Sequence, residues 1–113
     1  MILERPRRYL AVLSAAVLCL GLAGAQRVVA AAPAQFVIRD FMFAPLSLTV
    51  KAGTSVTWTN KDDEPHTVVS DTGLFRSAAV DTDETFSFKF DKPGTYHFTC
   101  SIHPRMVGTI VVE

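Results

Sequence analysis

The sequence has no net charge, no basic run and only two cysteines. Its 113 residues carry 11 Lys and Arg against 11 Asp and Glu, without a basic run. Nucleic-acid-binding domains need a basic patch, so we predict no nucleic-acid partner. No segment repeats at a period of about 20–50 residues, which argues against solenoids and propellers. The length predicts a single domain.

The longest apolar run lies in the first quarter of the chain and is typical of a targeting segment. Arg5, Arg7 and Arg8 precede residues 9–25, which carry no charge and end in Ala23-Gly24-Ala25. A basic start, an apolar centre and a small-residue end are the layout of a secretory signal peptide. The alternative is a membrane anchor, but this run is shorter than the roughly 20 apolar residues of a span.

We therefore predict that residues 1–25 are a signal peptide, which is cleaved after one of the residues 25–34, and that residues 26–34 form a flexible leader. The mature protein would be periplasmic, without a membrane span. Removing the signal leaves eight basic and ten acidic residues, with Cys100 as the only cysteine. A lone cysteine in an exported protein is a reactive thiol, half of an intermolecular bridge, or a metal ligand.

Residues 35–113 show a hydrophobic period of two, which is the pattern of strands with one buried face. The alternating segments are 36–38, 46–50, 56–58, 86–90 and 96–100. Turn-forming residues separate them, and no stretch has a helical period. This pattern predicts an all-β fold, an antiparallel two-sheet sandwich of about seven to eight strands. Residues 73–83 are the one irregular span.

The C-terminal part of the chain holds a compact group of possible metal ligands. Cys100, His103 and Met106 have the spacing C-x₂-H-x₂-M, and His66 opens a predicted strand over residues 67–69. Two imidazoles, one thiolate and a weak thioether are the ligand set of a blue-copper site. Zinc would need a further cysteine or a hard ligand in place of Met106.

Each of these residues also has a simpler explanation. A buried cysteine often acts as a small hydrophobe, a methionine as core filler, and a histidine as a surface residue. The ligand hypothesis depends on their joint occurrence with the strand pattern and the export signal. His97 is an odd number of residues from Cys100 on the predicted strand, so its side chain should point to the opposite face, outward, without a ligand role. Asp62-Asp63-Glu64 is interpreted as a solvated turn.

At these residues the chain resembles the cupredoxins of the amicyanin, pseudoazurin and plastocyanin branch, and its short ligand loop has the amicyanin form. The resemblance rests on Val56-Thr57-Trp58-Thr59-Asn60, Glu64-Pro65-His66-Thr67-Val68, Pro93-Gly94-Thr95-Tyr96 and the segment 100–112. It implies a Greek-key sandwich with one copper ion, held by His66, Cys100 and His103 with Met106 as the axial ligand.

The resemblance also implies local contacts and partners. The backbone amide of Thr67 would donate to the cysteine sulfur, and the Thr67 hydroxyl would face Ser101. Redox proteins would dock transiently near His103, where Arg105 replaces the apolar residue of amicyanin-like proteins.

We predict an exported monomer that shuttles single electrons as Cu(I)/Cu(II). The alternative is a periplasmic copper chaperone or storage protein. An enzyme is not expected, because the His-x-His pairs of multicopper oxidases and the residue order of a hydrolase are missing from this sequence.

Overall fold

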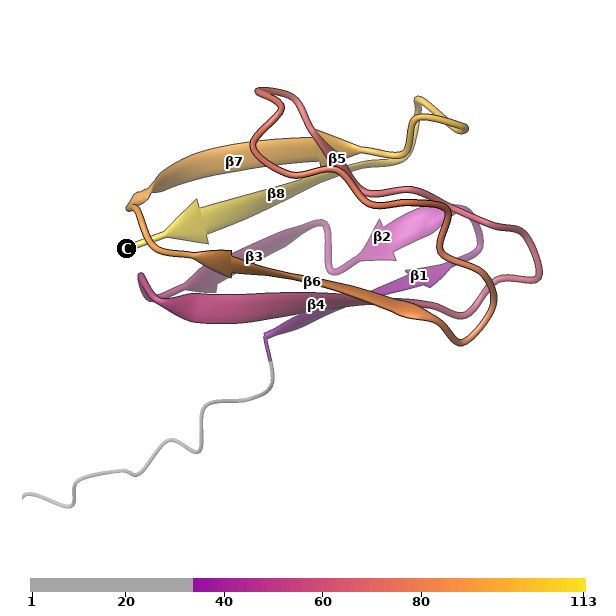
Figure 1. Cartoon of the computed structure of the whole chain (residues 1–113), viewed down its shortest axis with the longest axis horizontal. Coiled ribbons are helices and arrows are strands. Elements are labelled where there is room, and N and C mark those ends of the chain that lie inside the picture. The colour runs from indigo at the N-terminus through magenta and orange to yellow at the C-terminus, as the bar shows by residue number, and fades with distance from the viewer. Residues whose placement is uncertain (1–33) are drawn as a thin grey trace, which may run out of the picture.

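The computed structural model describes residues 34–113, so the predicted signal peptide and all but the last residue of the leader lie outside the described residues. The described chain forms two four-stranded sheets with the strand orders β2-β1-β4-β6 and β3-β8-β7-β5 (Figure 1). The strands are β1 (Gln35–Arg39), β2 (Met42–Ala44), β3 (Ser47–Val50), β4 (Thr54–Asn60), β5 (Val69–Ser70), β6 (Thr85–Phe90), β7 (Gly94–Thr99) and β8 (Val107–Val112). The predicted all-β sandwich is confirmed.

The sheets are mixed, whereas the sequence pattern predicted antiparallel ones. β1 pairs with β4 and β3 pairs with β8 in parallel, and the other pairs are antiparallel. The reason is the short bend at Pro45 and Leu46, through which the chain passes from β2 in one sheet to β3 in the other. The chain does not reverse there, so β4 runs in the same direction as β1 (Figure 1).

The predicted strand at residues 67–69 is also shorter and later than expected. β5 contains only Val69 and Ser70. His66 instead forms an isolated bridge with Val80, in which each backbone amide donates to the other residue's carbonyl, at 3.1 and 2.7 Å. Val80 lies in the span 73–83, which is irregular as predicted.

An aromatic cluster fills the space between the two sheets. Trp58 is fully buried, and its ring stacks on Phe36 with 5.6 Å between centroids. Phe98, from the opposite sheet, meets these two rings edge-on at 5.0 and 5.3 Å. Such pairs contribute about 0.5–1.5 kcal/mol each beyond the burial of their area. They fix one sheet against the other, and therefore also fix the loops at their ends.

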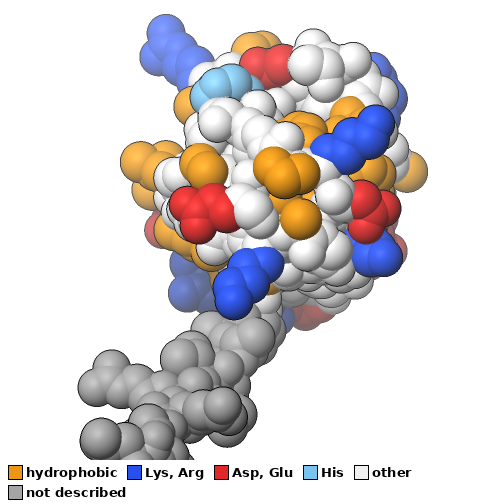
Figure 2. Space-filling view, turned by 90° about the vertical axis from the view of Figure 1, so that its left-hand side faces the viewer, with side chains coloured by type: hydrophobic (Ala, Val, Ile, Leu, Met, Phe, Trp, Pro, Cys, Tyr) orange, Lys and Arg blue, Asp and Glu red, His pale blue; other side chains and the backbone are white. Residues whose placement is uncertain are grey.

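Three connections meet at one end of the sandwich, on the right of Figure 1. They are the β1–β2 hairpin tip (residues 40–41), the β4–β5 connection (61–68) and the β7–β8 loop (100–106). Figure 2 views the opposite end, where acidic and basic side chains are interspersed. Among the described residues, no helix is long and apolar enough to cross a membrane.

Candidate metal centre

Three metal-ligating side chains converge at the loop end of the sandwich. The sulfur of Cys100 lies 3.8 Å from Nδ1 of His66 and 3.8 Å from Nδ1 of His103. The ligand atoms of the three residues all lie within 4.8 Å of one another. Cys100 and His66 are fully buried, whereas His103 is partly exposed. One ion could therefore contact all three atoms while remaining shielded from water on most sides.

The spacing of these atoms fits a trigonal metal site. Bonds from a small divalent metal of about 2.3 Å to sulfur and about 2.0 Å to nitrogen, at 120°, place the two ligand atoms about 3.7 Å apart. The two observed sulfur to nitrogen separations of 3.8 Å agree with this value. A thiolate with two imidazoles in a trigonal arrangement is the donor set that suits copper.

The β4–β5 connection stabilises the sulfur as a thiolate. The backbone N–H of Thr67 points at Cys100 Sγ at 3.4 Å, and the Thr67 hydroxyl lies 3.7 Å from it. Burial acts to raise the pKa of Cys100, but hydrogen bonds from Thr67, the His103 side chain and the backbone amides of Ile102 and His103 outweigh it. The net effect lowers the pKa below its ordinary value. Because the thiolate is the metal-binding form, this environment favours a ligand.

The Thr67 hydroxyl also joins the two ligand-bearing segments. It lies 2.7 Å from the Ser101 hydroxyl and accepts a hydrogen bond from the Ser101 backbone amide at 2.8 Å. The contact expected from the resemblance is therefore present. It fixes the residue after Cys100 to the residue after His66.

The orientation of His66 is set by Asp62. Nε2 of His66 lies 2.8 Å from Oδ2 of Asp62, whose side chain is only 10% exposed. Burial acts to raise the pKa of Asp62, but hydrogen bonds from the amide of Phe41, from His66 and from the amide of Asp40 lower it below its usual value. An ionised carboxylate only accepts, so Nε2 of His66 donates to Asp62 and Nδ1 is the ring nitrogen that faces Cys100.

Asn60 shapes the turn that carries Asp62. This residue is fully buried, and its amide group donates to the carbonyls of Glu64 and Val80 at 2.8 and 2.9 Å. Its side-chain oxygen accepts from the backbone amide of Asp62 at 2.9 Å. The interpretation of residues 62–64 as a solvated turn is therefore wrong for Asp62, although Asp63 and Glu64 are exposed.

The hairpin tip supplies a further residue that the sequence did not predict. The ring of Phe41 meets the imidazoles of His66 and His103 edge-on, with centroids 5.4 and 4.9 Å apart. Asp40 and Phe41 have φ angles of 53° and 56°, which L-residues other than glycine adopt at a cost of about 1–2 kcal/mol each. A carboxylate four residues before a candidate metal-binding histidine was the available signal for Asp62. Phe41 had no such signal.

Met106 is buried beside the ligand loop, and His97 lies outside the candidate site. Met106 is buried, its carbonyl accepts from the amide of Cys100 at 3.1 Å, and its amide donates to the carbonyl of His103 at 2.9 Å. The loop therefore closes on itself with Met106 beside the other residues of the motif. His97 points outward, as predicted, where its Nδ1 lies 3.0 Å from the Thr109 hydroxyl.

A mixed β-sandwich with a buried nitrogen and sulfur donor set at its loop end defines a class of small metal-binding domain. The family model described as "Cupredoxin-like domain" matches residues 11–112. The chain belongs to this cupredoxin-like family, as the sequence resemblance indicated.

Individual relatives agree with this assignment. Amicyanin-alpha of Methylorubrum extorquens is 38% identical over 99 residues, which cover 80% of this chain and 83% of the relative. Plastocyanin of Scenedesmus fuscus is 39% identical over 85 residues, covering 64% and 87%.

Solved structures are similar as well. A Cu(I) form of an amicyanin variant has a TM-score of 0.67 at 30% identity, covering 70% of this chain and 80% of that chain. A purple cupredoxin from Nitrosopumilus maritimus has a TM-score of 0.67 at 35% identity, covering 71% and 99%.

Proposed function

We propose that this protein is an exported, monomeric carrier of single electrons that holds one copper ion between His66, Cys100 and His103, with Met106 as the axial ligand. The observation that carries the proposal is the convergence of one thiol sulfur with two Nδ1 atoms, each 3.8 Å away. It is further supported by the similarity to an amicyanin solved with Cu(I). Copper supplies a Cu(I)/Cu(II) couple when bound.

The protein's own residues suit electron transfer because they resist rearrangement. His66 is held by Asp62 through its ring and by Val80 through its backbone. The sulfur is held by Thr67. A donor set that keeps its geometry in both oxidation states has a small reorganisation energy for electron transfer. Electron transfer of this kind requires no bound substrate. We therefore propose a carrier and not an enzyme.

The burial of the site favours a carrier over a chaperone or store. His66 and Cys100 have no exposed surface: His66 lies in the β4–β5 connection between the two sheets, and Cys100 begins the β7–β8 loop within one sheet. A protein that hands over its metal needs ligands that an acceptor can reach. Only the edge of His103 offers such access.

Redox partners would dock around His103. Phe41, Ile102, Pro104, Arg105 and Met106 surround it and line a surface hollow of about 380 Å³. Phe41 and Ile102 are 46% and 51% exposed. An apolar surface around a partly exposed ligand suits a small and short-lived interface, and Arg105 adds positive charge at its rim.

The decisive experiment is a titration of the purified mature protein with Cu(II), followed by visible absorption spectroscopy. We expect an intense thiolate-to-copper charge-transfer band that is lost in Cys100→Ser and kept in the matched variant Ser101→Ala. Colourless protein that binds zinc more tightly than copper would contradict the proposal. Fast loss of copper to a chelator, with slow electron self-exchange, would favour the chaperone or store.

Export to the periplasm remains part of the proposal and rests on the N-terminal sequence pattern. N-terminal sequencing of the protein recovered from the periplasmic fraction would test it. We expect the first residue to lie between 26 and 35. Recovery of the intact chain from the membrane fraction would instead indicate an anchor.

A further inference from the structure

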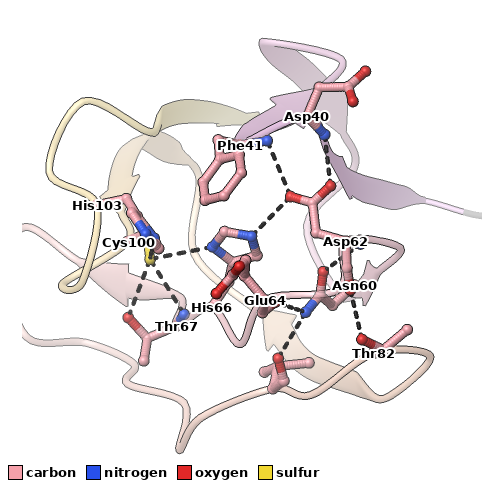
Figure 3. A network of polar contacts seen from close by, with 11 residues as sticks. Asp40, Phe41, Asn60, Asp62, Glu64, His66, Thr67, Thr82, Cys100 and His103 are labelled. Atoms are coloured by element: carbon pink, nitrogen blue, oxygen red, sulfur yellow. Dashed lines mark hydrogen bonds and ion pairs between the residues drawn. The ribbon is translucent and has the colours of Figure 1, made fainter.

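The carboxylate of Asp62 accepts hydrogen bonds from both His66 and the β1–β2 hairpin tip (Figure 3). On one side, Oδ2 lies 2.8 Å from Nε2 of His66. On the other side, Oδ1 accepts from the backbone amide of Asp40 at 2.7 Å and Oδ2 accepts from that of Phe41 at 3.0 Å. Three N–H donors from two separate segments therefore converge on one side chain.

The hairpin tip needs these hydrogen bonds. Asp40 and Phe41 both occupy the left-handed backbone region, which is unfavourable for residues with a side chain. A conformation of this kind persists only where its surroundings hold it, and at a functional site it points to a role. Here its result is visible: the Phe41 ring lies against both candidate ligand imidazoles.

We propose that Asp62 is a positioning residue that couples a copper ligand to the docking surface. It fixes the tautomer and direction of His66, and it simultaneously holds Phe41 over His66 and His103. The part that concerns copper rests on the proposed function. The part that concerns the hairpin does not, because the hydrogen bonds exist within the protein alone.

The proposal predicts how a change at Asp62 acts on copper. A carboxylate hydrogen-bonded to the far nitrogen of a ligand histidine makes that histidine a stronger donor, and its loss typically lowers metal affinity by about 10–100-fold. The effect is larger for Cu(II) than for Cu(I), because Cu(II) carries more charge. A tenfold larger loss for Cu(II) raises the reduction potential by about 59 mV.

The variant that tests this is Asp62→Asn. An amide has one acceptor oxygen, so it cannot serve donors on both carboxylate positions, and its own N–H₂ would face another donor. The matched control is Asp63→Asn, which removes the same charge from the neighbouring exposed residue. Among the described residues, the Asp63 side chain makes no hydrogen bond or ion pair with His66 or the hairpin, so this variant reports the effect of the charge alone.

Two readouts decide the proposal. Voltammetry should give a reduction potential for Asp62→Asn that is higher than that of Asp63→Asn by at least about 59 mV, which corresponds to a tenfold larger loss of affinity for Cu(II) than for Cu(I). Hydrogen exchange in the copper-free protein should show faster exchange of the Asp40 and Phe41 amides in Asp62→Asn only. Equal potentials in the two variants, or wild-type exchange of these amides, would overturn it.

The positioning role of Asp62 and the electron-carrier role can fail independently of each other. If the wild-type protein fails to form a coloured copper site, the carrier proposal fails, while the exchange measurement still tests the positioning role. If Asp62→Asn does not fold, ¹⁵N spectra of the copper-free wild type replace it. They should show His66 protonated at Nε2 and protected amides at Asp40 and Phe41, and the opposite tautomer would refute the proposal.

Discussion

Thr67 offers a sharp test of how the two ligand-bearing segments are held together. Its hydroxyl accepts from the Ser101 amide at 2.8 Å and lies 2.7 Å from the Ser101 hydroxyl. The substitution Thr67→Val keeps the shape of the side chain and the backbone N–H that reaches Cys100, but it removes the hydroxyl. It therefore removes the hydroxyl's contacts with Ser101, together with its longer contact of 3.7 Å to Cys100 Sγ.

The expected loss of stability follows from what each broken hydrogen bond leaves behind. Ser101 is exposed, so its hydroxyl regains a water molecule and contributes little. Its backbone N–H is part-buried and loses its acceptor, at a cost of about 1–3 kcal/mol for an unsatisfied buried donor. Partial access to water places the total at the low end, about 1–2 kcal/mol. In a domain of this size that lowers the melting temperature by about 4–16 °C.

The assay is urea denaturation of the copper-free protein, with Ser101→Ala as the control. Ser101→Ala removes only the exposed hydroxyl and keeps the backbone hydrogen bond, so we expect a change within about 0.5 kcal/mol. The slope of the free energy against urea should remain constant across the set. The reasoning fails if Thr67→Val is as stable as Ser101→Ala, because the inter-segment hydrogen bond would then contribute nothing.

Three further predictions concern the core, the rim of the site and the metal. Gly108→Ala should lower stability by about 1–3 kcal/mol in urea denaturation, because the added Cβ would clash with the buried ring of Phe98; an unchanged midpoint would contradict this packing. Arg105→Glu should slow oxidation by an anionic complex and accelerate oxidation by a cationic one at low salt, with both effects fading at high salt. Lys92→Glu, in the turn at the opposite end of the sandwich, serves as the control, and an equal response from both variants would exclude local steering. Free copper at about 1,000 times its dissociation constant should raise the free energy of unfolding by about 4 kcal/mol, and calorimetry of Cys100→Ser should show no such gain.

The fold class could be predicted because strands with one buried face show alternating apolar and polar residues along the sequence. The alternation of Phe86, Phe88 and Phe90 with polar residues is visible in six consecutive residues, and the structure buries that face to different degrees. The relative direction of paired strands produces no such sequence pattern. Whether β4 runs parallel to β1 depends on the bend at Pro45 and Leu46, where the chain changes sheets without reversing.

The same division applies to the site. Cys100, His103 and Met106 are close in sequence, so their spacing alone predicted a shared loop. His66 is 34 residues from Cys100, and it was assigned from the number of ligands that a copper site needs and from the family resemblance. The structure adds that its Nδ1 and the cysteine sulfur approach to 3.8 Å.

By itself, the sequence determined the alternating strands, the lone cysteine and the set of possible soft ligands, because each of these is a property of single residues or of near neighbours. Only the tertiary structure decided that Asp62 serves His66 and the Asp40–Phe41 tip together, and that Phe41 covers both imidazoles. The contacts of Asp62 with the hairpin tip join residues more than 20 positions apart, whereas Asp62 and His66 are only four apart. Asp62 lies beside the hairpin tip because β1 and β4 are neighbours in one sheet, whereas Phe41 reaches His103 because the two sheets, packed through Trp58, Phe36 and Phe98, bring their loops to one end. No local sequence pattern determines either arrangement.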